Sequence, residues 1–159
     1  MDIQYIFKLA SEFRHALDSV VDKRQYGRLT MFQSFPNGCC TYASDLLAEY
    51  LIENGVRRER IQALSSEADK GYYSHCWLLI DGMYCLDITG DQLNAKALFK
   101  KYRPIPACCI APKGTSYFER FTNQTLQHTY SVGIDTYGGD IPEKLRVVYN
   151  AAINQIEND

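Results

Sequence analysis

The sequence predicts an α+β domain in which helices and strands occupy separate stretches of the chain. Helical periodicity dominates the N-terminal part and returns at the C-terminus, while strand-like runs cluster between them. The clearest local signal is Asp81-Gly82, which separates apolar runs at residues 75–80 and 83–88 and predicts a β-hairpin. Because the strands follow one another instead of alternating with helices, we expect helices packed on an antiparallel sheet.

Two amphipathic helices are predicted before the strands. Apolar residues recur at helical spacing over residues 3–21 and again over residues 40–51. Asn54-Gly55 ends the second helix, because glycine readily adopts the left-handed conformation that closes a helix. Residues 23–38 are more polar and contain turn-forming residues, so we expect a loop that leads into the second helix.

The strand-rich half is less clearly patterned outside the hairpin. Its shorter elements are expected at residues 61–64 (strand), 91–101 (helix) and 107–111 (strand). Residues 65–71 are expected to form a loop, and residues 112–140 show no clear pattern. The last helix is expected to begin near Pro142, because proline is favoured in a first helical turn.

Length and composition limit the class of protein. The 159 residues, of which 46% are hydrophobic, fit a single domain over residues 1–159. A domain of this size can form its hydrophobic core without disulfides or a structural metal. A net charge of −2 and the lack of a basic block argue against nucleic acid as a partner. No apolar run is long enough to cross a bilayer, so no membrane association is expected.

The six cysteines form neither a zinc-binding spacing nor a CxxC pair, so no metal site is predicted. The N-terminus lacks the basic and apolar regions of a signal peptide. We therefore expect reduced thiols and a cytoplasmic location. An effector secreted by another route would show the same pattern.

Cys40, His75 and Asp87 together provide what a catalytic thiol needs: a lowered pKa, a base and a group that orients the base. Cys40 lies where the loop turns into a helix, and a helix N-terminus favours a thiolate and offers N–H groups to an oxyanion. His75 begins the first hairpin strand and Asp87 lies near the end of the second, within side-chain reach across the ladder. A turn centred between residues 81 and 82 pairs His75 with Ile88, and a slip of one residue changes the face that Asp87 occupies.

This order of residues resembles a known superfamily. Residues 35–40, Phe-Pro-Asn-Gly-Cys-Cys, and the helix after them resemble the nucleophile helix of papain-like and transglutaminase-like cysteine enzymes. Residues 74–78, Ser-His-Cys-Trp-Leu, and residues 86–89, Leu-Asp-Ile-Thr, resemble the strands that carry their histidine and aspartate. The chain order is similar to that of transglutaminases, arylamine acetyltransferases and bacterial glutamine-deamidase effectors. The resemblance covers residues 33–93.

The resemblance implies a nucleophile helix packed on an antiparallel sheet, with Cys40 as nucleophile, His75 as general base and acid, and Asp87 as orienter. It implies a thiol-dependent acyl-transfer enzyme acting on an amide bond of a protein or peptide, as a cysteine protease or a protein glutamine deamidase without a cofactor. A transglutaminase or acyltransferase is one alternative. A non-catalytic binding module that retains the fold is the other.

Several assignments have competing interpretations. Cys39 replaces Cys40 as the candidate nucleophile if the helix begins one residue earlier. Gln33 is a weaker candidate for an oxyanion donor, because papain-like enzymes place a glutamine shortly before the cysteine. Trp77 shares a strand face with His75 and either walls the substrate site or packs in the core. Asp91-Gln92 also resembles a segment of such proteins, and a capping or loop-fixing role is expected for this pair.

Overall fold

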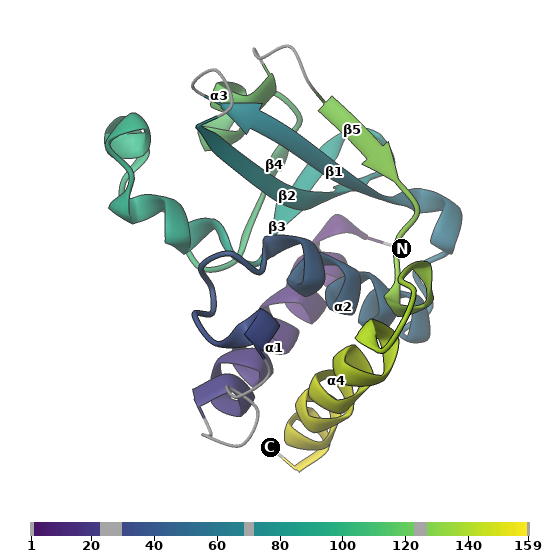
Figure 1. Ribbon diagram of the computed structural model, residues 1–159. Coiled ribbons are helices and arrows are strands. Elements are labelled where there is room, and N and C mark those ends of the chain that lie inside the picture. The colour runs from purple at the N-terminus through teal and green to yellow at the C-terminus, as the bar shows by residue number, and fades with distance from the viewer. Residues whose placement is uncertain (1, 23–29, 69–71, 123–126, 159) are drawn as a thin grey trace.

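The computed structural model describes residues 2–22, 30–68, 72–122 and 127–158, and it confirms the α+β class (Figure 1). The helices are α1 (Ile3–Asp22), α2 (Cys40–Glu53), α3 (Glu119–Thr122) and α4 (Ile141–Asn158). The strands are β1 (Ile61–Ala68), β2 (Tyr73–Ile80), β3 (Tyr84–Asp87), β4 (Cys109–Pro112) and β5 (Gln127–Tyr130). They form one antiparallel sheet in the order β4-β3-β2-β1-β5.

The sheet is covered on both faces, so the central strand β2 is buried on both sides. Its even-numbered residues, Cys76, Leu78 and Ile80, face the core formed with α1, α2 and α4. Its odd-numbered apolar residues, Trp77 and Leu79, face a second core. This second core is supplied by the 3-10 helices η4 (Gly90–Ala95), η5 (Ala97–Tyr102) and η6 (Ser116–Phe118) and by α3. In Figure 1 the three long helices lie together on one side of the sheet.

The predicted hairpin is present, but its register differs by one residue from the expected pairing of His75 with Ile88. Asp81 and Gly82 both have positive φ, and Met83 N–H donates to the Ile80 carbonyl at 3.0 Å. The ladder then resumes with Ile80 opposite Tyr84, so the turn contains three residues instead of two. Met83 is the extra residue, and every later residue of β3 is displaced by one position.

Other elements differ from the sequence prediction in extent. The predicted strand 61–64 continues to Ala68, because β1 pairs with β2 on one side and with β5 on the other. The helix expected over residues 91–101 is two short 3-10 helices. The loop expected at 65–71 is therefore wrong for residues 65–68, which belong to β1, and residues 69–71 lie outside the described residues. Of the loop expected at 23–38, residues 23–29 lie outside the described residues, and the remainder contains the short 3-10 helix η1 (Thr30–Phe32). Within the described ranges, none of the helices combines the length and the apolar character needed to cross a membrane.

Arg14 joins α1 to the segment that follows β3. Its guanidinium donates to both carboxylate oxygens of Asp91 at 2.9 and 2.8 Å, and to the carbonyls of Ile88 and Ala107 at 2.5 and 3.1 Å. The same group lies 4.9 Å from the centre of the Phe35 ring in the loop before α2. A single buried cation from α1 therefore contacts the loop before α2, the segment after β3 and the segment before β4.

We expect Arg14→Met to lower the free energy of unfolding by about 2–3 kcal/mol, because Asp91 and two carbonyls lose their partner. Arg146→Met is the matched control, since Arg146 pairs with the exposed Asp135 and its loss should cost no more than about 0.5 kcal/mol. Urea denaturation measures both values. Equal losses in the two variants would show that Arg14 acts only as a surface charge.

Candidate active site

The loop before α2 gives the two adjacent cysteines different environments. Gly38 has φ of +71°, which favours glycine, and α2 begins at Cys40. Cys39 precedes the helix with its side chain turned inward, where it is 1% exposed and its thiol donates to the Pro36 carbonyl at 3.3 Å. Cys40 is only partly buried and contacts His75. Of the two candidate nucleophiles, the structure places Cys40 beside the histidine.

His75 and Asp87 meet because of the shifted hairpin register. The paired residues of β2 and β3 end at Leu78 and Leu86, and continuing this register puts Asp87 opposite Trp77, on the same sheet face as His75. His75 Nε2–H donates to Asp87 Oδ2 at 2.6 Å, and both side chains are 1% exposed. The two-residue turn predicted from the sequence would have placed Asp87 on the opposite face.

The Asp87 carboxylate accepts hydrogen bonds from three further donors. Thr89 supplies its backbone N–H at 2.7 Å and its hydroxyl at 3.0 Å to Oδ1, and the Tyr117 hydroxyl donates to Oδ2 at 2.7 Å. Burial by itself would raise the pKa of Asp87, but the charge and hydrogen bond of His75, with help from Thr89 and Tyr117, hold it below its usual value. Asp87 is therefore a fixed buried anion.

Cys40 and His75 form a hydrogen-bonded pair at the beginning of β2. Because Nε2 of His75 is bound to Asp87, the ring presents Nδ1 to the sulfur. β3 pairs with β2 only at Leu78–Ile80, so the start of β2 is open to α2, and the Cys76 backbone N–H also bonds to the Cys40 sulfur. The N-terminus of α2 thus meets the sheet where β2 lacks a β3 partner.

The electrostatics of this pair favour charge separation. Burial would lower the pKa of His75, but the charge and hydrogen bond of Asp87 and the bond to Cys40 outweigh it and raise the pKa to about 10. Burial would raise the pKa of Cys40, but the hydrogen bond and charge of His75 lower it below the usual value. Burial raises the pKa of Cys39 to about 12 and that of Cys85 to about 11. The arrangement can hold a thiolate beside an imidazolium.

Neither of the two weaker candidates lies in the functional position expected for it from the sequence. Gln33 is exposed and lines a surface cavity of about 430 Å³ with Asp18, Val21 and Phe35, and its described contacts do not include Cys40 or His75. Trp77 is fully buried, with its ring centre 5.9 Å from that of His75 and 5.2 Å from that of Phe121. Trp77 therefore packs in the second core beside the imidazole of His75 and does not face solvent.

Two residues at the site were not assigned this position from the sequence. Tyr117 comes from η6, in the stretch without a clear pattern, and nothing local indicates that it reaches Asp87. Gln92 was expected only to fix its loop, yet its Nε2 lies 3.4 Å from His75 Nδ1. The sequence signal that pointed toward Gln92 was the position of the Asp91-Gln92 pair, soon after Asp87 in the chain.

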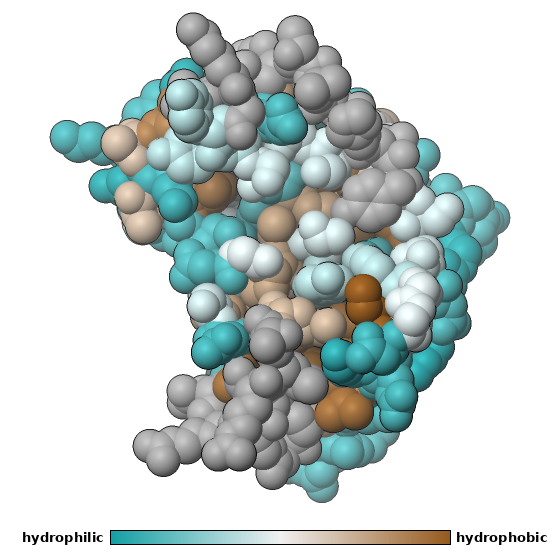
Figure 2. Space-filling view, viewed as in Figure 1, coloured by the Kyte–Doolittle hydropathy of each residue, from teal (hydrophilic) through white to brown (hydrophobic). Residues whose placement is uncertain are grey.

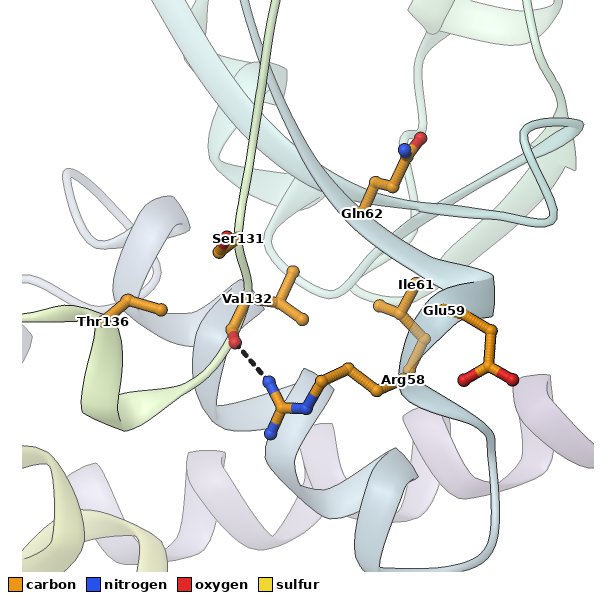
Figure 3. Close-up of a pocket in the computed structure, with 7 residues that line it drawn as sticks. All are labelled: Arg58, Glu59, Ile61, Gln62, Ser131, Val132 and Thr136. Atoms are coloured by element: carbon orange, nitrogen blue, oxygen red, sulfur yellow. Dashed lines mark hydrogen bonds between the residues drawn. The ribbon is translucent and has the colours of Figure 1, made fainter.

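The face shown in Figure 2 is largely hydrophilic, with a band of more apolar residues in a hollow near the first turns of α2. A separate cavity of about 550 Å³ lies at the other end of β1 (Figure 3). There Arg58 donates to the Val132 carbonyl at 2.7 Å, and the lining contains neither a thiol nor an imidazole. Among the residues that the structure describes, no group of three or more His, Cys, Asp or Glu is placed to hold a metal ion.

Comparison with known proteins adds no assignment: no family model, no curated protein and no solved structure matches this chain. The class of site is therefore defined by its own geometry, a thiol, an imidazole and a carboxylate joined in that order by hydrogen bonds.

Proposed function

We propose that this protein is a thiol-dependent acyl-transfer enzyme that acts on an amide carbonyl. The observation that supports this most is the chain of hydrogen bonds from the partly buried Cys40 through the buried His75 to the buried Asp87. A histidine paired with a carboxylate is common in protein cores. A histidine that also contacts a thiol at a helix N-terminus, with the pKa of that thiol lowered, is typical of nucleophilic catalysis.

In this proposal Cys40 is the nucleophile and His75 the acid and base. The Cys40 thiolate adds to the carbonyl carbon, and the carbonyl π electrons move to oxygen. When the intermediate collapses, the C=O bond re-forms, the C–N bond breaks and the His75 Nδ1–H protonates the departing nitrogen. Water then gives a proton to His75 and adds to the thioester, which releases the acid and restores the thiolate.

Asp87 acts through His75 by holding Nε2–H and therefore directing Nδ1 toward the sulfur. The N–H groups in the first turn of α2 lie beside Cys40 and suit an oxyanion at the attacked carbonyl. Water as acceptor corresponds to a protease or a protein glutamine deamidase. An amine as acceptor corresponds to a transglutaminase or acyltransferase.

Selective alkylation tests this proposal. We expect iodoacetamide at neutral pH to modify Cys40 much faster than the other five cysteines, because only a thiolate reacts rapidly. Cys39, Cys85 and Cys108 have raised pKa values and should react slowly. Peptide mapping by mass spectrometry after short exposure identifies the modified residue. Slow labelling of all accessible thiols at similar rates would support a non-catalytic binding module instead.

Mass analysis of candidate protein substrates separates the possible reactions. Proteolysis shortens the chain, and deamidation replaces an amide NH₂ by OH without cleavage. Transfer to an amine releases ammonia and adds the mass of the acceptor amine less that of ammonia. Cys40→Ala is the control, since it removes the sulfur and should abolish whichever change is seen. A change that persists in Cys40→Ala would contradict the assigned nucleophile.

A further inference from the structure

Gln92 occupies the space between the loop that precedes Cys40 and the strand that carries His75. Its Nε2–H donates to the Thr89 carbonyl at 2.9 Å, and its Oε1 accepts the Gly38 N–H at 3.4 Å. Nε2 also lies 3.4 Å from His75 Nδ1, on the side of the ring that faces Cys40. The amide of Gln92 thus contacts both His75 and the backbone two residues before Cys40.

The two outer contacts fix which way the amide points. In the reverse orientation, Oε1 would face the Thr89 carbonyl and the NH₂ group would face the Gly38 N–H. Both contacts would then be repulsive, because like groups would oppose each other. The NH₂ group is therefore held toward His75.

Protonation of His75 changes the bonding of this NH₂ group. A primary amide has two N–H bonds, and one of them is used by the Thr89 carbonyl. The second can donate to Nδ1 only while that nitrogen is unprotonated. When Nδ1 carries a proton, as the contacts of His75 with Asp87 and Cys40 favour, the second N–H of Gln92 has lost this acceptor.

We propose that this released N–H of Gln92 is a donor to the oxyanion formed when Cys40 attacks a carbonyl. The assignment rests on the proposed acyl transfer and names Gln92, from η4, in place of Gln33. As the C–S bond forms, the carbonyl π electrons move to oxygen, and the negative oxygen accepts the N–H of Gln92. When C=O re-forms and the leaving group departs, that hydrogen bond weakens. Gln92 neither gains nor loses a proton.

Two reagents that differ in their need for an oxyanion test this role. Iodoacetamide reacts with the thiolate by displacement of iodide at a saturated carbon, and no oxyanion forms. p-Nitrophenyl acetate acylates the thiolate through a tetrahedral oxyanion and releases p-nitrophenolate. We expect Gln92→Ala to slow acylation of Cys40 about 100-fold while changing alkylation by less than about threefold. The nitrophenolate burst measures acylation, and peptide mapping measures alkylation.

Two further variants separate the oxyanion role from a structural one. Gln92→Met retains the side-chain length without a donor, and it should give the same selective loss if Gln92→Ala folds poorly. Asn94→Ala loosens the same 3-10 helix, because Asn94 accepts the Ile105 N–H at 2.9 Å and donates to its carbonyl at 2.8 Å. Asn94→Ala should lower stability but leave the ratio of acylation to alkylation unchanged.

The outcomes distinguish this inference from the proposed function. If the wild-type protein is acylated and the Gln92 variants are acylated equally fast, Gln92 is not the donor, although Cys40 remains the nucleophile. If the variants lose acylation and alkylation by the same factor, Gln92 only positions the ion pair, and the inference is again overturned. If wild-type Cys40 reacts with neither reagent, both the inference and the proposed function fail.

Discussion

Replacing His75 by alanine is expected to slow alkylation of Cys40 at pH 7 by about 100-fold. In the wild-type protein, the hydrogen bond and charge of His75 outweigh burial and lower the pKa of Cys40 from its ordinary value of 9.0. Without the imidazole, burial remains and holds the pKa at or above that value. A thiol with a pKa of 9.0 is only about 1% ionised at pH 7, which sets the size of the expected loss.

The pH profile of alkylation provides a readout that a loss of stability would not reproduce. The wild-type rate should rise to its plateau at a pH below 9.0, and the His75→Ala profile should be displaced to higher pH. His15→Ala, on an exposed position of α1, is the matched control and should leave the profile unchanged. Identical profiles for wild type and His75→Ala would contradict the proposal that Cys40 and His75 form a thiolate–imidazolium pair.

Asp87→Ala is expected to destabilise the fold by about 3–5 kcal/mol, because it leaves the imidazolium of His75 buried without its counter-charge. It also removes the acceptor of the Thr89 and Tyr117 donors. Chemical denaturation near pH 6 measures the loss. Asp135→Ala removes an exposed carboxylate paired with Arg146, and it should cost no more than about 0.5 kcal/mol.

The same comparison has a defined pH dependence. The folded pKa of Asp87 lies below its ordinary value of 3.8, so its stabilisation is present above pH 3.8 and is lost as pH falls through the folded pKa. The pKa of His75 is raised from 6.5 to about 10, so its stabilisation is complete below pH 6.5 and is lost as pH rises toward 10. The gap between wild type and Asp87→Ala should therefore be largest between pH 3.8 and 6.5. A gap that widens in stronger acid would contradict this linkage.

Local signals in the sequence were sufficient for the helices and the hairpin. Apolar periodicity marks α1, α2 and α4, and Asp81-Gly82 marks the turn, because both signals lie within a few residues of the structure that they specify. The register was wrong because the extra turn residue, Met83, depends on how the ladder closes and not on the Asp-Gly pair alone. The apolar periodicity of the two strands does not determine how many residues form the turn between them.

The environment of the candidate site depended on contacts between distant segments. Adjacent Cys39 and Cys40 differ only in which way each points at the start of α2, and a helix boundary read from sequence is not accurate to one residue. Tyr117 reaches Asp87 from a segment thirty positions later in the chain. Gln33 was selected by its place before the cysteine, whereas the glutamine beside His75 follows Asp87.

The exposed turn at Met83 makes the site sensitive to length as well as to residue identity. Asp87 shares a face with His75 because three residues, and not two, join β2 to β3. Loss of one residue from this turn would leave Cys40, His75 and Asp87 in the chain, yet it would turn the Asp87 side chain toward α2 and away from the imidazole. Insertions and deletions in surface loops are ordinarily tolerated. In this turn, however, a one-residue deletion would remove the contact between Asp87 and His75 without replacing any residue of the site.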